Sequence, residues 1–308
     1  MHFDPAKDIS DLSGKTIVVT GGSSGLGKES VLQLVKHNPD KVYLAARTSK
    51  RGNAAIEEIE KEVPAAKGKI QYLELDMASF ASVKKAADRI LSENDRIDIL
   101  MNNAGTSGNS ADLTSDGYEV QFGSNYMGPT LFTKLLLPLL QQTAEQPDSD
   151  VRIINLSSEL FKQAPKDGIL FPTLTTPAEN ISSVARYGQS KLANYYFSKL
   201  CAQKYPNITS IALHPGVVNT GIWDNLKTRR PVLGTLLSIV CGPFLTNVSD
   251  GAKMQLWSST APKSQVKNGA FYTSAGNGKE YTQAILQNDK LANELWDWTE
   301  KEFAKHGY

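Results

Sequence analysis

The feature that most constrains this chain is a repeated alternation of short apolar runs with segments of helical pattern. The runs are continuously apolar and rich in β-branched residues, such as TIVVT at 16–20, which indicates strands covered on both faces. Strands that alternate with helices predict a parallel sheet between two helical layers. We therefore expect an α/β fold with a Rossmann-type, doubly wound parallel sheet. The expected strands are 16–20, 42–45, 70–75, 97–101, 151–156, 208–213 and 269–273, and the expected helices are 25–37, 53–63, 79–93, 118–142, 186–205 and 291–305.

The 308 residues contain no repeat and no interdomain linker, so we expect a single Rossmann-fold domain over residues 1–308. Two irregular stretches, at about 159–185 and 222–247, are expected to cover the substrate. Their large apolar residues are candidates for an apolar pocket, although ordinary core packing accounts equally well for any one of them. These residues are Phe161, Phe171, Trp223, Leu226, Leu233, Leu236, Leu237 and Phe244.

Charge and cysteine content exclude several classes of protein. Lys and Arg number 33 and Asp and Glu 32, without the basic stripe that nucleic-acid binding needs. Cys201 and Cys241 have no CxxC spacing, so we expect no disulfide framework and no metal site, and a reducing, cytoplasmic location. The longest apolar stretch, 231–245, is too short for a transmembrane anchor, which needs about 20 residues. It could touch a membrane surface but has no clear basic face.

A glycine-rich loop joins the first expected strand to the first helix. Gly21, Gly25 and Gly27 have the spacing GxxxGxG, interleaved with Ser23, Ser24 and Leu26. Glycines allow a tight turn close to a pyrophosphate, and the N-terminus of the following helix favours the anion. A plain glycine-rich turn is the alternative, but the strand–loop–helix context favours dinucleotide binding.

The end of the second strand indicates which dinucleotide is bound. An acid at this point usually contacts the ribose of NAD, whereas an arginine accommodates the 2′-phosphate of NADP. The chain has no acid there and has Arg47, followed by Lys50 and Arg51. We expect NADP(H), the alternative being that Arg47 is an ordinary surface residue. Asp76, after the third strand, could meet the adenine or simply begin a helix.

The sharpest catalytic signal is YGQSK at 187–191. The i, i+4 spacing places Tyr187 and Lys191 on one face of a helix. A neighbouring ammonium favours phenolate and lowers the tyrosine pKa from its usual value of about 10. Tyr187 could then exchange a proton with a carbonyl or alcohol oxygen, and Lys191 could hold the nicotinamide ribose. The pair alone is also common on ordinary helix surfaces.

Polar residues at other strand ends fall where a parallel sheet presents its ligand crevice. Ser158 follows the fifth strand and could steady a substrate oxygen, or it could simply cap the strand end. The segment NNAG at 102–105 follows the fourth strand and could be a simple turn. Asn125 lies within the long helix, where it could hold a water of a proton relay or be exposed.

Together these motifs resemble the short-chain dehydrogenase/reductase family in its NADP-dependent form. The resemblance implies that Ser158, rather than Ser157, holds the substrate oxygen, that Tyr187 is the acid/base, and that Lys191 binds ribose and tunes Tyr187. Asn125 would support the proton relay, and Asn103 would contact the adenosine side. Val218 and Thr220 would lie beside the nicotinamide carboxamide. The matching cofactor segments also include Ala104 and Gly105, and Pro215 and Gly216.

Within the family, the chain is similar to retinol dehydrogenases, WW-domain oxidoreductases and fungal reductases of the same build. In related proteins the two long helices, here 118–142 and 186–205, often form a dimer face, so a homodimer is possible. We expect reduction of a small hydrophobic ketone or aldehyde, or oxidation of the matching alcohol. The alternatives are a non-catalytic NADP-binding regulator or scaffold and a non-redox reaction on the same fold.

Overall fold

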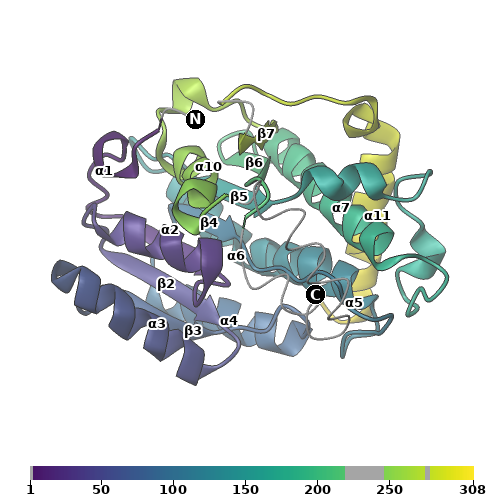
Figure 1. The fold of residues 1–308 in the computed structure, drawn as a ribbon, viewed down its shortest axis with the longest axis horizontal. Helices are drawn as coiled ribbons and strands as arrows, with labels where there is room; N and C mark the ends of the chain where they lie inside the picture. Colours follow the sequence, from purple (N-terminus) through teal and green to yellow (C-terminus); the bar gives the residue numbers. More distant parts are fainter. Residues whose placement is uncertain (1–2, 219–245, 275–277) are drawn as a thin grey trace.

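The computed structural model of the protein describes residues 3–218, 246–274 and 278–308. In this part of the chain, seven strands form one parallel sheet in the order β3-β2-β1-β4-β5-β6-β7 (Figure 1). The expected doubly wound sheet is confirmed, and each strand bound agrees with the expected one within two residues. The strands are β1 (Thr16–Thr20), β2 (Lys41–Ala46), β3 (Ile70–Glu74), β4 (Ile99–Asn102), β5 (Arg152–Leu156), β6 (Thr209–His214) and β7 (Phe271–Thr273).

Two hydrophobic cores, one on each face of the sheet, hold the helices in place. Side chains of a strand alternate between them: Val18 points into one core, and Ile17 and Val19 into the other. One face carries α1 (Pro5–Asp8), α2 (Gly25–Val35), α3 (Ser49–Glu62) and α10 (Val248–Thr260). The opposite face carries α4 (Phe80–Glu93), α5 (Val120–Phe122), α6 (Gly128–Ala144), α7 (Ser183–Lys204) and α11 (Asp289–Lys305).

The crossover between β1 and β4 positions the functional site. From β1 the chain proceeds outward through β2 and β3, then returns to pair β4 with the other edge of β1. Because all strands are parallel, the loops that follow β1, β4, β5 and β6 leave the same edge of the sheet. A ligand crevice is expected at this switch point.

The helix expected over 118–142 is interrupted. It begins as α5, passes through a π-helical turn at Gly123–Met127, and continues as α6. Pro129 has no N–H to donate to the carbonyl of Asn125, four residues earlier, and this breaks the α-helical ladder. Gly128 adds a second constraint, because a Cβ there would lie 2.2 Å from the Met77 carbonyl oxygen.

Helix α10 is not among the expected elements. Asn247 caps it, since its Oδ1 accepts a hydrogen bond of 2.7 Å from the backbone N–H of Asp250. The helix has no clear apolar stripe, because its buried residues include Gly251, Gln255 and Ser258 beside apolar side chains. It packs against α2, directly behind the glycine-rich loop.

Helix α11 crosses α7 and the start of α6 on the outer side of the molecule (Figure 1). Trp296 stacks on Phe197 of α7 with ring centroids 5.9 Å apart, and Lys134 of α6 pairs with Glu300 at 2.6 Å. The chain's own helix thus packs along α7 and touches α6 through Lys134. Among the described helices, none has both the length and the apolar character that a bilayer crossing needs.

Candidate active site

The glycine-rich loop leaves β1 and enters α2 with a backbone that requires glycine. Gly21 and Gly25 have φ values of +66° and +53°, in the left-handed region. At Gly27, a Cβ would lie 2.4 Å from the Gly21 carbonyl oxygen. Ser24, the N-cap residue of α2, makes no side-chain cap, and no acid lies in the first turn. These features fit an anion such as a pyrophosphate at the helix N-terminus.

The loop after β4 supports the glycine-rich loop from the side. Asn103 donates from its amide nitrogen to the Thr20 carbonyl at 2.8 Å, and Ala104 donates its backbone N–H to the Thr20 hydroxyl at 3.0 Å. The amide group of Asn103 is therefore engaged by the loop backbone. Any contact of this residue with an adenosine would add to that supporting role.

The end of β2 presents positive charge beside this loop. The Ala45 carbonyl accepts a hydrogen bond of 2.9 Å from Gly22, so the next residues lie close to the loop. Arg47 is exposed there, and Lys50 and Arg51 lie in the first turn of α3, which contains no acid. The cluster suits a phosphate monoester.

Asp76 follows β3 and is partly buried. Its carboxylate accepts a hydrogen bond of 3.0 Å from the backbone N–H of Ala78, and its own N–H donates to the Ser82 hydroxyl. The residue thus shapes the turn into α4, whose N-cap is Ser79.

Tyr187, Lys191 and Ser158 come together at the end of β5. The Lys191 ammonium lies 5.5 Å from the centre of the Tyr187 ring and donates to the Leu156 carbonyl at 2.8 Å. Ser158 is buried and interacts with the Tyr187 hydroxyl. The hydroxyl of Ser157 instead donates to the backbone carbonyl of Lys191 at 2.6 Å, which anchors α7. This arrangement leaves Ser158 as the serine that faces Tyr187.

Burial dominates the electrostatics of this pair. It raises the pKa of Tyr187 to about 12, with the hydrogen bond to Ser158 acting in the opposite direction. It also lowers the pKa of Lys191 to about 7. The expectation of a lowered tyrosine pKa is therefore not met by the protein alone, since two desolvated groups each favour their neutral form. A bound ligand with negative charge near Lys191 would favour its ammonium.

Asn125 is buried, so the alternative of an exposed helix residue does not hold. Its amide oxygen accepts a hydrogen bond of 2.7 Å from the backbone N–H of Thr106. Its amide nitrogen donates to the Thr106 carbonyl and to the Ser190 hydroxyl, each at 3.0 Å. The π-helical turn thus points Asn125 at the loop after β4 and at α7, an irregularity frequently found at functional sites.

The loop after β6 completes the edge. Gly216 has a φ of +95° and follows Pro215, and Val218 is buried. A Cβ on Gly251 of α10 would lie 2.5 Å from Val218 and 3.0 Å from Leu26, so these side chains adjoin. Val218 therefore lies beside the residues of the glycine-rich loop. Thr220 and the candidate pocket residues from Trp223 to Phe244 lie outside the described residues.

Several residues of the site escaped sequence reasoning. Thr106 and Ser190 bond to Asn125, and a buried ion pair joins Arg186, next to Tyr187, to Glu119. For Thr106, Arg186 and Ser190, the position beside Asn103–Gly105 or within the segment around Tyr187 was the available signal. Phe161, by contrast, is fully buried against Phe271 and belongs to the core.

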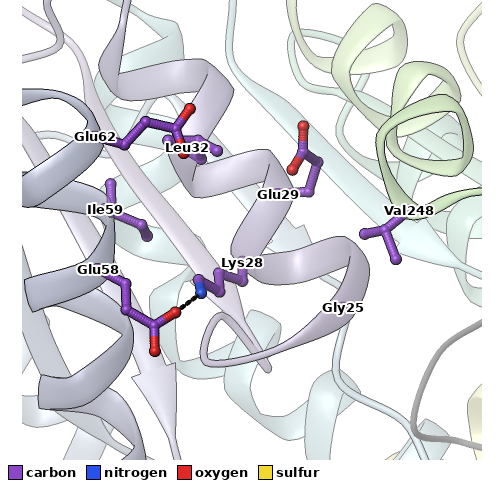
Figure 2. A pocket seen from close by; sticks show the side chains of 8 residues that line it. All are labelled: Gly25, Lys28, Glu29, Leu32, Glu58, Ile59, Glu62 and Val248. Atoms are coloured by element: carbon purple, nitrogen blue, oxygen red, sulfur yellow. Dashed lines mark hydrogen bonds and ion pairs between the residues drawn. The ribbon is translucent and has the colours of Figure 1, made fainter.

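A pocket of about 320 Å³ lies along α2, between α3 and the start of α10, and reaches Gly25 of the glycine-rich loop (Figure 2). Glu29, Glu58 and Glu62 line it with a single cation, Lys28, which pairs with Glu58. Its acidic lining disfavours phosphate, and neither Tyr187 nor Lys191 reaches it. The candidate site is therefore the strand edge, where Tyr187 and Lys191 lie.

Comparison with known proteins gives a consistent result. The short chain dehydrogenase family matches residues 15–171. An uncharacterized oxidoreductase of Schizosaccharomyces pombe is 37% identical over 96% of this chain and 87% of its own length. A short-chain dehydrogenase/reductase of Armillaria gallica is 36% identical over 95% of this chain and 91% of its own.

Solved structures share the fold. A protein from Mycobacterium paratuberculosis superposes with a TM-score of 0.74 at 24% identity, covering 96% of each chain. An NADPH-bound carbonyl reductase from chicken fatty liver superposes with a TM-score of 0.63 at 22% identity, covering 87% of this chain and 99% of its own. The chain therefore belongs to the short-chain dehydrogenase family, and its similar relatives are of the fungal type.

Proposed function

We propose that this oxidoreductase uses NADP(H) to reduce a hydrophobic ketone or aldehyde, or to oxidise the matching alcohol. The observation that carries the proposal is the joint burial of Ser158, Tyr187 and Lys191 at the strand edge that also holds the glycine-rich loop. When bound, the nicotinamide supplies the hydride that reaches the carbonyl carbon.

The chain's own residues handle the oxygen and its proton. Ser158 would donate a hydrogen bond to the carbonyl oxygen, and Tyr187 would give its proton to the same oxygen as the C–H bond forms. Lys191 would hold the ribose and, as an ammonium, favour the phenolate that remains. Asn125 would order a water through which Tyr187 regains a proton.

Two features support the choice of cofactor and of substrate class. Arg47, with Lys50 and Arg51, would pair with the 2′-phosphate of NADP, and structural neighbours of this fold hold NADP or NADPH. Leu160 and Val184 are exposed apolar side chains, 41% and 52% exposed, on segments that flank Tyr187. They would favour a hydrophobic substrate.

The test follows NADPH absorbance with a panel of hydrophobic aldehydes, ketones and quinones, with NADH, Tyr187→Phe and Arg47→Ala alongside. We expect turnover with NADPH and little with NADH. Tyr187→Phe should lose at least about 100-fold in kcat, because proton transfer contributes roughly 10²–10⁴-fold, yet still bind NADPH. Arg47→Ala should weaken NADPH binding and leave NADH binding unchanged.

Other outcomes separate the alternatives. Full activity of Tyr187→Phe would refute its acid/base role, and equal use of NADH would refute the role of Arg47. NADPH binding without turnover of any panel member would favour a regulator or scaffold. We place the protein in the cytoplasm as part of the same proposal. The Neurospora crassa relative is named a mitochondrial oxidoreductase, so microscopy of a tagged protein tests this placement.

A further inference from the structure

A buried ion pair lies directly beside the catalytic tyrosine. Arg186 precedes Tyr187 in α7, and its guanidinium donates to the Glu119 carboxylate at 2.6 Å. The two side chains are only 4% and 1% exposed. Because burying two charges carries a large desolvation penalty, such a pair is weak evidence for stability and calls for another role.

Arg186 joins segments that are far apart in sequence. Besides Glu119, its guanidinium donates to the backbone carbonyls of Asn109 at 3.0 Å, Ser110 at 3.3 Å and Ile181 at 3.3 Å. Asn109 and Ser110 belong to the loop after β4, and Ile181 precedes α7. The planar guanidinium, with five donors, suits this task in a way that an ammonium does not.

Glu119 connects the pair to the helix that leads to Asn125. While one carboxylate oxygen accepts from Arg186, the other accepts the backbone N–H of Phe122 at 2.7 Å and so caps α5. Helix α5 runs directly into the π-helical turn that holds Asn125. The ion pair thus lies at the start of α5, which leads to Asn125, and in the first turn of α7, which carries Tyr187.

A continuous series of hydrogen bonds leads from Arg186, through Asn109, back to Tyr187, its neighbour in the sequence. Thr106 donates to the Asn109 side chain at 2.7 Å, and its backbone N–H donates to Asn125 at 2.7 Å. Asn125 then donates to the Ser190 hydroxyl at 3.0 Å. Ser190 in turn donates to the backbone carbonyl of Tyr187 at 2.7 Å.

We infer that Arg186 and Glu119 are positioning residues, which fix Tyr187 and Asn125 relative to each other and to the loop after β4. The inference rests on the proposed acid/base role of Tyr187. Small displacements of reacting groups carry large rate penalties. Loss of the pair should therefore impair the chemical step more than cofactor binding.

The experiment compares Arg186→Met, Glu119→Gln and the conservative Arg186→Lys with a matched control. Arg152 is also a buried arginine: it is 2% exposed, pairs with Asp150, and donates to the Ser258 carbonyl at 2.9 Å. It lies at the start of β5, the opposite end of the strand from Ser158. Arg152→Met therefore removes a similar buried cation away from the site.

For Arg186→Met we expect kcat on a reactive aldehyde or quinone probe to fall by roughly 10–100-fold. NADPH affinity should stay within about twofold, since the pair does not touch the glycine-rich loop. Arg152→Met should lower Tm but leave kcat per folded molecule unchanged. Arg186→Lys should recover part of the lost kcat, a rescue that a purely structural role would not produce.

Unchanged kcat in folded Arg186→Met, with Tyr187→Phe inactive, would overturn the positioning role alone. Activity in Tyr187→Phe would instead overturn the proposed function. Where a variant folds poorly or the probe is not turned over, hydrogen–deuterium exchange is the second measurement. In Glu119→Gln, exchange should rise together in residues 104–127 and 183–191, and wild-type exchange in both would refute the inference.

Discussion

At the scale of single residues, Lys191 destabilises the folded protein, although the proposed function requires it. Its ammonium is buried with one carbonyl partner, and burial lowers its pKa to about 7 from 10.5. A lysine that protonates less readily in the folded protein destabilises the fold. This decrease in the free energy of unfolding is full below pH 7 and disappears as the pH approaches 10.5.

Lys191→Met should therefore stabilise the cofactor-free protein at pH 7. Methionine keeps most of the packing, and the Leu156 carbonyl retains its second hydrogen bond, from Asn194 at 3.0 Å. Since the pKa falls from 10.5 to about 7 and one pKa unit corresponds to about 1.4 kcal/mol, we expect a gain of at most about 5 kcal/mol, with loss of turnover. Thermal unfolding across this pH range would show the gain shrinking at high pH.

The exposed Lys290→Met serves as the control and should change neither Tm nor its pH dependence. A lower Tm for Lys191→Met at pH 7 would contradict this account of Lys191.

Individual residues also show where sequence reasoning ends. The chain order and strand ends sufficed to place Ser158, Tyr187 and Lys191 in one site. They could not assign Phe161 to the core rather than to a pocket, because a large apolar side chain suits both. The Arg186–Glu119 pair joins residues 67 positions apart, and its partners are visible only in the folded chain.

At the scale of elements, helix α10 packs behind the glycine-rich loop and contains none of the proposed catalytic residues. Gly251 lets α10 approach Val218 and Leu26, and Gln255 donates to the Leu26 carbonyl at 3.1 Å. A helix that supports the glycine-rich loop from behind should influence affinity for the dinucleotide.

Gly251→Ala should weaken NADPH binding, because the added methyl group must displace Val218 or Leu26. Overpacking of about 1 kcal/mol corresponds to roughly a fivefold rise in Kd, which a fluorescence titration of bound NADPH can measure. The partly exposed Lys253→Ala in the same helix should leave Kd unchanged. An unaltered Kd in Gly251→Ala would show that α10 does not support the loop.

Central strands such as β1 and β2 were predictable because they are nearly continuous apolar runs, as a doubly covered sheet requires. Helix α10 was not, because glycine, glutamine and serine share its buried side with apolar residues and hide the helical period. The π-helical turn was not predicted either, since it depends on Pro129 and on the contact of Gly128 with Met77.

At the scale of the whole molecule, the position of α11 affects whether two copies of the chain can associate through α6 and α7. The dimer face implied by the family resemblance would use the outer sides of the helices that became α5–α6 and α7. Trp296, Glu300 and Thr299 of α11 already occupy part of that surface, on Phe197, Lys134 and Tyr126 respectively.

We therefore expect a monomer rather than a dimer through these helices. Light scattering coupled to size exclusion should give 33.6 kDa at all concentrations tested. A mass twice as large that drops when charge is introduced on the outer face of α7 would contradict this expectation.

The contacts of α11 also have a consequence for synthesis on the ribosome. The strands that hold the dinucleotide edge, β1 to β4, are complete by Asn102. Tyr118 and Tyr126, which lead into the catalytic half, bond to Glu302 and Thr299, more than 170 positions later. Domains tend to fold from the N-terminus as they emerge. A nascent chain would therefore form β1 to β4 early, and the segment that carries Tyr118 and Tyr126 would stay unfinished until α11 emerged.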